Sequence, residues 1–327
     1  MSVRARHLIA YGASMFSLLI FQLICYTDAF GTFSDYNLDL VYSLIAQILC
    51  MGIIPITVLV ILNKGKPNEL RKRLRYQAPR DKKACLLLTL GIMLLITPYA
   101  MAFNALTNLL FIIVGYKRPS SVGTIYLGRG DLAMMMLLIA ILPAIFEEFT
   151  HRGLLLSGLQ DRGSEYTAVI LSAVMFGLMH TNPTQMIFTT FGGLVFAVAV
   201  VKSDSMIPAM CGHFANNAVA VFLEYSTQRQ TKFGVWYDKL VSSNTTISAV
   251  ITFAVLALSL FGMVRLLQYA ARKAPKPVAE KKLLSVVPLD AYSPNGKATL
   301  KENAVLYATI AAEGAFLLFL FLWGIVK

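Results

Sequence analysis

Long runs of hydrophobic residues, separated by shorter polar connections, dominate the chain. A helix needs about 20 apolar residues to cross the roughly 30 Å hydrocarbon core of a bilayer. Nine runs come near that length, at residues 8–26, 39–62, 84–114, 131–157, 166–182, 184–201, 206–224, 247–268 and 303–326. The pattern predicts an all-α polytopic transmembrane helix bundle with eight or nine spans. The third run is too long for one straight span, and Pro98, Asn104 and Asn108 predict a kink or a re-entrant end there.

The composition supports a membrane environment and excludes several classes of protein. Hydrophobic residues make up 57% of the 327 residues, charged residues make up 14%, and the mean hydropathy is +0.65. A soluble chain carries about 25% charged residues and could not bury so much apolar surface. A soluble enzyme, a disordered chain and a disulfide scaffold are therefore excluded. The net charge of +12 fits loops that face an anionic membrane surface, so we expect the lipid bilayer and no nucleic acid as a partner.

Lysine and arginine residues fall mostly in alternate connections between the predicted helices. If the N-terminus is cytoplasmic, the inner segments hold 22 of the 29 basic residues and the outer segments hold 7. Because cytoplasmic loops are enriched in Lys and Arg, this asymmetry predicts a cytoplasmic N-terminus and an external C-terminus. We therefore expect a multi-pass protein of the cell (plasma) membrane.

We expect residues 1–327 to form a single membrane-embedded domain. Two hydrophilic stretches interrupt the apolar pattern. The basic connector at 63–83 is predicted to lie as a surface helix on the lipid headgroups, and 271–302, with four prolines, is predicted to be an irregular cytoplasmic linker. The run at 303–326 is then an additional C-terminal span. The polar residues of chemical interest fall within 131–225, the expected catalytic core.

Two adjacent glutamates lie near the end of the fourth apolar run, and an ionisable residue inside a span marks a functional site by default. Adjacent residues differ by about 100° around a helix, so Glu147 and Glu148 face different ways. Glu148 and Arg152 are four residues apart and can form an ion pair, which leaves Glu147 to point into the bundle. Pro143 predicts a bend just before the pair. A helix end that emerges at the membrane surface, with an ordinary surface ion pair, explains this spacing equally well.

Two further predicted helices carry a histidine with a second notable residue one turn away. Phe176 and His180 share a face of the fifth helix, and His213 and Asn217 share a face of the seventh. His213 and Asn217 would present hydrogen-bond donors in one direction. Each pattern also has an ordinary structural explanation: a histidine bonded to a carbonyl at a helix end, and a polar contact between membrane helices.

Taken together, the patterns E-E-x-x-x-R, F-x-x-x-H and H-x-x-x-N follow one another on three apolar helices. In this order they resemble the CAAX-protease and bacteriocin-processing family, also called CPBP or Abi, of intramembrane glutamic endopeptidases. That family includes endopeptidases that cut prenylated CAAX proteins, lysostaphin-resistance-type proteins and bacteriocin self-immunity proteins. The resemblance covers roughly residues 131–225, and the remaining helices fit only as generic membrane spans.

The resemblance implies a role for each motif residue. Glu147 matches the general base, His180 matches the histidine that helps to orient and activate water, and His213 with Asn217 matches the pair that stabilises the oxyanion. Glu148 and Arg152 match the flanking positions that the spacing already predicts to be a supporting ion pair. One departure is His151, where the family more often has an aromatic residue. His151 could reach the Glu147 carboxylate, but we do not expect it to be catalytic.

The chemistry implied by the resemblance is hydrolysis of a membrane-anchored or lipidated peptide or protein by activated water, without a metal or another cofactor. No Ser, Cys or Thr lies beside a histidine as a convincing nucleophile, which favours direct attack by water. A zinc-dependent protease is one alternative, because Glu147, His180 and His213 could hold zinc with an open position for water, although the H-E-x-x-H motif is absent. A non-proteolytic immunity or partner protein of the same family is another. A proton-relaying transporter would show duplicated halves, which the sequence lacks.

Overall fold

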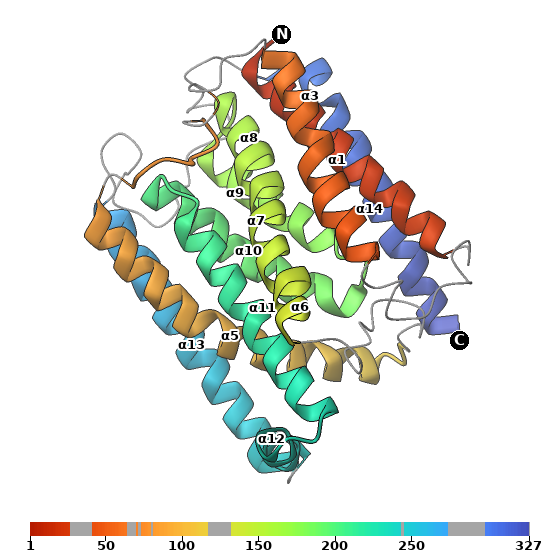
Figure 1. Ribbon diagram of the computed structural model, residues 1–327, viewed down its shortest axis with the longest axis vertical. Coiled ribbons are helices and arrows are strands. Elements are labelled where there is room, and N and C mark those ends of the chain that lie inside the picture. Colours follow the sequence, from red (N-terminus) through yellow and green to blue (C-terminus); the bar gives the residue numbers. More distant parts are fainter. Residues whose placement is uncertain are drawn as a thin grey trace.

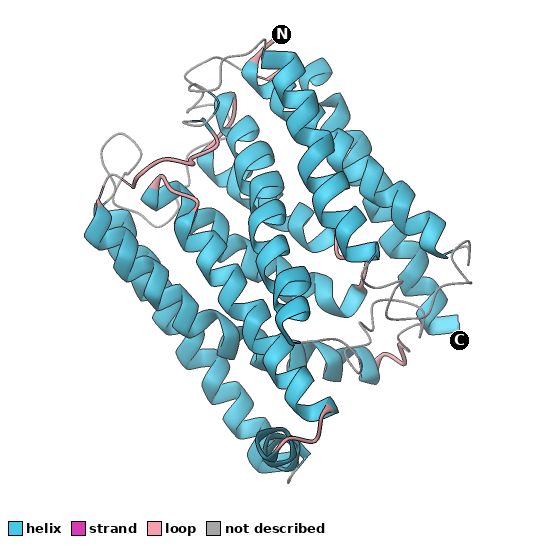
Figure 2. Ribbon diagram, in the orientation of Figure 1, coloured by secondary structure: helices cyan, strands magenta, loops and turns pink. Residues whose placement is uncertain are grey.

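The computed structural model describes residues 1–26, 41–63, 70, 73–79, 81–116, 132–242, 245–273 and 298–326. Within these ranges the chain is a bundle of helices without strands (Figures 1 and 2). The predicted all-α polytopic architecture is confirmed. Most of the linker at 271–302 and part of the basic connector at 63–83 lie outside the described residues. The expected surface helix is wrong for residues 74–79 of the connector, which form turns and loop, because Leu74 is buried in the core of the bundle.

Helices occupy all nine predicted runs. The first three runs form α1 (Val3–Tyr26), the second helix with its π-helical part η1 (Ile45–Ile53) and α3 (Ile54–Asn63), and α5 (Lys82–Ile113). The fourth run forms the motif helix, which comprises α6 (Leu132–Met135), η3 (Met136–Ile141), α7 (Leu142–Glu148), η4 (Phe149–Leu156) and α8 (Ser157–Asp161). The helices that follow are α9 (Glu165–Leu178), α10 (Pro183–Ser203), α11 (Ile207–Gln228), α12 (Lys232–Ser242), α13 (Thr245–Lys273) and α14 (Leu300–Val326).

Seven helices of the described chain are long and apolar enough to cross a membrane. The predicted runs outside this set are the fifth and the seventh. α9 has 14 residues, about 21 Å at 1.5 Å per residue, and is short of a roughly 30 Å hydrocarbon core. α11 has 22 residues but carries His213, Asn216 and Asn217 within its length. Among the described residues, length and composition thus support seven spans beside the nine candidate runs, because α9 is too short and α11 carries polar residues within its length.

α5 is a single continuous helix of 32 residues with Pro98 in its interior. Figure 1 shows α5 changing direction part-way along its length, as the predicted kink requires, and the alternative of a re-entrant end stays a prediction. Proline has no N–H to donate to the carbonyl one turn before it, yet helical residues on both sides keep the element intact. A helix of this length exceeds the hydrocarbon core, so it must tilt or extend beyond the bilayer.

The motif helix lies in the middle of the bundle (Figure 1). α11 packs along one side of it, and α1 and the second helix pack along the other. α9 and α10 pack against each other, while α5 and α13 form a second layer beyond α10 and α11. Site residues from α7, the end of α9 and α11 are thus carried by elements that contact one another or a shared neighbour.

The C-terminal helix α14 runs beside α1 and in the same direction. At their first turns Ser2 hydrogen-bonds Glu302, and the Arg4 Nε donates to Asn303 Oδ1 at 2.8 Å. Arg4 Nη1 also donates to the Leu159 carbonyl at 2.7 Å, which ties α1 to α8. The two ends of the described chain consequently lie at opposite ends of the bundle (Figure 1).

Candidate active site

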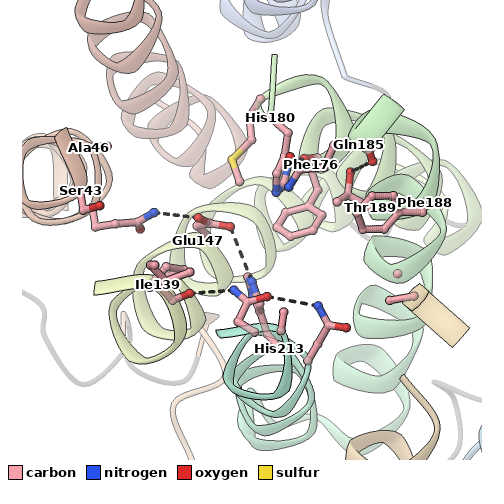
Figure 3. A pocket seen from close by; sticks show the side chains of 18 of the residues that line it. Ser43, Ala46, Ile139, Glu147, Phe176, His180, Gln185, Phe188, Thr189 and His213 are labelled. Atoms are coloured by element: carbon pink, nitrogen blue, oxygen red, sulfur yellow. Dashed lines mark hydrogen bonds and ion pairs between the residues drawn. The ribbon is translucent and has the colours of Figure 1, made fainter. Parts of the chain in front are cut away.

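The structure brings Glu147, His180, His213 and Asn217 to the wall of one cavity of about 610 Å³ inside the bundle. α7 supplies Glu147, the segment after α9 supplies His180, and α11 supplies the other two. Glu147, His180 and His213 point toward a common space (Figure 3). The Phe176 ring contacts both histidines edge-on, with ring centroids 5.0 Å from His180 and 5.6 Å from His213.

The Glu147 carboxylate has one oxygen fixed and one free. Its Oε1 accepts a hydrogen bond from Gln47 Nε2 at 2.7 Å. Its Oε2 has no hydrogen-bond partner among the described residues, and His213 Nε2 lies 3.8 Å away. The side chain is 7% exposed and lines the cavity. A water molecule or a substrate oxygen beside Oε2 would therefore lie against both Glu147 and His213.

Glu148 does not line the cavity, and its carboxylate accepts hydrogen bonds from two other residues. Its Oε1 accepts from Arg152 Nη1 at 3.0 Å and from His213 Nδ1 at 2.9 Å. Glu148 and Arg152 are both fully buried, so the pair is not the surface pair that the sequence left open. Because a carboxylate only accepts, His213 Nδ1 carries a hydrogen. Its Nε2, which faces Glu147, can then donate a hydrogen bond only when the ring is doubly protonated.

The Arg152 guanidinium contacts two aromatic rings and a backbone carbonyl as well as Glu148. It lies over the Phe176 ring at 4.3 Å from the centroid and near the Phe196 ring at 5.5 Å, a cation–π arrangement. Its Nη2 donates to the Gly193 carbonyl at 3.0 Å. A Cβ atom at Gly193 would lie 3.1 Å from Phe176 and 3.2 Å from Arg152 Nη2. A glycine at this point lets α10 approach closely enough to bind the arginine.

We expect Gly193→Ala to lower the free energy of unfolding by about 1–3 kcal/mol, because the added methyl group overpacks a filled contact. Gly192→Ala is the matched control, since a Cβ there meets nothing within 4 Å. In a helix that control should be neutral or stabilising by up to about 1 kcal/mol. Thermal unfolding of both variants in detergent measures the difference, and equal melting temperatures would contradict the close packing at Gly193.

His180 is oriented by the end of α9. The helix stops at Leu178, and the His180 N–H bonds the Gly177 carbonyl instead of continuing the α-helical pattern. The Phe176 carbonyl therefore remains available at the helix C-terminus. His180 Nδ1 donates to it at 2.7 Å. The ring thus caps the helix with one nitrogen and leaves Nε2 for the cavity. The structural explanation of this histidine is observed, and its catalytic role stays a prediction.

Asn217 donates a hydrogen bond to the Ile139 carbonyl, which Pro143 cannot bond because it has no N–H. Its Nδ2 donates to the Ile139 carbonyl at 3.0 Å (Figure 3). Pro143, four residues after Ile139, has no N–H to satisfy that carbonyl in the helix. The surrounding turn, η3, is also π-helical, a distortion that is frequent at functional sites. One N–H of the Asn217 amide is therefore committed to the scaffold, and one remains for a ligand.

A comparison with known protein families gives a match to the part of the chain that contains Glu147, His180, His213 and Asn217. Residues 129–219 match a family described as Rce1-like, type II CAAX prenyl endopeptidase Rce1-like. This segment matches the CAAX protease family. The resemblance predicted from the three motifs is thereby confirmed, and at the level of the family it supports an intramembrane protease. No curated protein and no solved structure gave a match to the chain.

Within the matched segment 129–219, His151 does not line the cavity. It is fully buried, its Nε2 contacts Met179 Sδ at 3.0 Å, and its ring packs edge-on against Tyr11 and Phe176. It makes no hydrogen bond to Glu147 in the described chain. The departure from the family pattern is thus accommodated in the packing between α1, η4 and α9.

A polar residue outside the matched segment also reaches the site. Gln47, in η1, bonds the Glu147 carboxylate, and the sequence analysis did not single it out. Gln47 belongs to none of the three motifs, and helical periodicity within its own run does not indicate a partner in another helix. A search for any strong hydrogen-bonding side chain within the run at 39–62 would have found it, though not its partner.

No group of three or more His, Cys, Asp or Glu side chains in the described part of the chain is arranged to hold a metal ion. The bonds that the three residues of the zinc alternative make within the protein do not exclude zinc, because a zinc-bound histidine also uses its other ring nitrogen for such a bond. His180 and His213 each use Nδ1 for a bond within the protein, and Glu147 uses Oε1. Zinc would have to bind the atoms that remain, which are Glu147 Oε2, His180 Nε2 and His213 Nε2. Chelation experiments test for such a site.

Proposed function

We propose that this protein is an intramembrane endopeptidase in which Glu147 activates water for attack on a peptide bond. The observation that carries the proposal is the free Oε2 of Glu147, which is buried at the cavity wall and 3.8 Å from His213 Nε2. A general base needs an acceptor that no other donor occupies, and Oε2 has no hydrogen-bond partner among the described residues. The family match, which includes the residues concerned, supports the same reaction class.

In the proposed reaction, Glu147 Oε2 takes a proton from a water that His180 Nε2 also contacts. The hydroxide oxygen bonds the peptide carbonyl carbon, and the carbonyl oxygen becomes an oxyanion. The remaining N–H of Asn217 and the Nε2–H of a doubly protonated His213 donate to that oxyanion. Glu147 then returns the proton to the leaving amine as the C–N bond breaks. Losing one oxyanion donor typically lowers the rate by about 10²–10³-fold.

The proposed substrate is a membrane-anchored or lipidated peptide or protein. The cavity lies among helices that are long and apolar enough to span a membrane, and apolar side chains such as Leu18, Ile96 and Phe188 share its wall with the polar groups. A chain whose anchor is in the bilayer could reach such a site from the side. We further propose that the protein resides in the cell membrane with its N-terminus in the cytoplasm, as the distribution of Lys and Arg predicts.

The experiment is cleavage of membrane-anchored test peptides by the purified protein in detergent, with products identified by mass spectrometry. One peptide carries a C-terminal prenylated cysteine, and its partner has the same sequence with a transmembrane anchor and no prenyl group. We expect cleavage at one defined bond, abolished by Glu147→Ala. No cleavage of either peptide, together with a cellular phenotype that persists in Glu147→Ala, would instead support a non-proteolytic immunity or partner protein.

A further inference from the structure

Gln47 contacts the proposed general base from a helix that none of the three motifs includes. Its Nε2 donates to Glu147 Oε1 at 2.7 Å, and the side chain is only 9% exposed. The two residues are separated by 100 positions in the chain, so the contact exists only in the fold. In Figure 3 a dashed line reaches Glu147 from the helix that carries Ser43 and Ala46.

The helices on which the two residues lie are also held together about one turn beyond Gln47. A Cβ atom at Gly52 would lie 2.7 Å from Phe146 Cε1, so the second helix comes very close to the motif helix beside Glu147. Thr150 Oγ1 donates to the Met51 carbonyl at 3.2 Å. Gln47 is in the π-helical part of its helix, a local distortion typical of functional sites. The amide is therefore presented from a closely packed interface.

The hydrogen bond determines where the reactive oxygen of Glu147 points. A glutamate side chain in a cavity can rotate, but fixing Oε1 leaves Oε2 directed at the space in front of His213. The same hydrogen bond serves both protonation states of the base. When Glu147 Oε2 takes a proton from water, Oε1 remains an acceptor and can keep the hydrogen bond from Gln47 Nε2.

We propose that Gln47 is a positioning residue that holds the Glu147 carboxylate in the orientation needed to activate water. This inference rests on the proposed function. Gln47 does not touch the reacting atoms and acts through Glu147. Since misplacing a reacting group by about 1 Å can lower a rate by roughly 10²-fold, losing the bond should affect turnover more than substrate binding.

The test compares Gln47→Met with Thr150→Val. Met fills a similar volume without a donor, and the control removes the neighbouring hydrogen bond across the same interface without touching Glu147. We expect Gln47→Met to lower kcat by about 10–10²-fold with KM little changed, while Thr150→Val keeps the wild-type kcat. Gln47→Asn, which keeps the amide but withdraws it by one methylene group, should also lower kcat and serves if the Met variant fails to fold. Equal losses of kcat in Thr150→Val and Gln47→Met would overturn the proposal.

Infrared difference spectra test the contact without any substrate. The difference between wild type and Glu147→Gln assigns the carboxyl bands of Glu147, and these bands should shift in Gln47→Met but not in Thr150→Val. An unshifted band in Gln47→Met would overturn the inference even if the protein is an active protease. If the band shifts in Gln47→Met but the wild-type protein cleaves neither test peptide, the hydrogen bond is supported and the proposed function is wrong.

Discussion

Glu147→Gln is expected to lower kcat by about 10²–10⁴-fold while leaving the protein folded, because general-base catalysis contributes a factor of that size. The substitution keeps the size and polarity of the side chain. The introduced amide oxygen can accept the same hydrogen bond from Gln47, so the interface with the second helix is preserved. Substrate affinity should change little. Initial rates of peptide cleavage at saturating substrate, with folded protein quantified by size-exclusion chromatography, measure the effect.

Glu224→Gln is the matched control for this loss. Glu224 lies on α11, as His213 does, but it is exposed and accepts a hydrogen bond from Gln228 on its own helix. Its neutralisation should leave kcat unchanged. Wild-type activity in Glu147→Gln would remove both the glutamate mechanism and the zinc alternative, because each assigns this carboxylate an essential role.

Glu148→Gln is expected to lower the free energy of unfolding by about 3–5 kcal/mol, since it leaves Arg152 buried without a counter-charge. It also weakens the acceptor that holds His213 Nδ1, so the folded fraction should lose activity as well. Arg152→Lys keeps the positive charge and should be less damaging, although an ammonium cannot reproduce the simultaneous bonds to Glu148 and Gly193. Thermal unfolding and yield in detergent rank the variants.

A less buried ion pair serves as the control for the loss of stability expected in Glu148→Gln. Arg162 and Glu302 lie 3.2 Å apart with partly exposed side chains, and such pairs contribute about 0–1 kcal/mol. Arg162→Gln, which leaves the bonds of Glu302 to Ser2 and Thr299 in place, should therefore have a small effect beside Glu148→Gln. If Glu148→Gln and Arg152→Lys both express and cleave like the wild type, the buried pair has no supporting role in the site.

Much of the site could be predicted because its chemistry follows helical periodicity. Residues four apart share a face, and this alone predicts the Glu148–Arg152 pair, which the structure contains at 3.0 Å. The order of the three motifs predicted the family that matches residues 129–219. Apolar run lengths predicted the all-α architecture, because a bilayer requires about 20 apolar residues in each crossing helix.

The remaining features depend on contacts between segments distant in sequence, which periodicity does not report. The bond from Gln47 to Glu147 joins two separate helices, and the bond from Asn217 to the Ile139 carbonyl requires the turn that Pro143 leaves unsatisfied. His213 has a supporting carboxylate because Glu148 faces α11 as well as Arg152. The short α9 was counted as a span because its apolar run includes residues beyond the end of the helix.

Adding a chelator to the wild-type protein, with zinc measured in the same sample, tests most directly whether the water is activated without a metal ion. The assay uses protein purified in detergent, the membrane-anchored peptide that it cleaves, and a strong zinc chelator. We predict undiminished cleavage by protein that contains far less than one zinc per chain, because no ligand set is being emptied. Stoichiometric zinc, loss of cleavage on chelation and its recovery on adding Zn²⁺ would contradict the account, and loss of bound zinc in His180→Ala would identify the ligand.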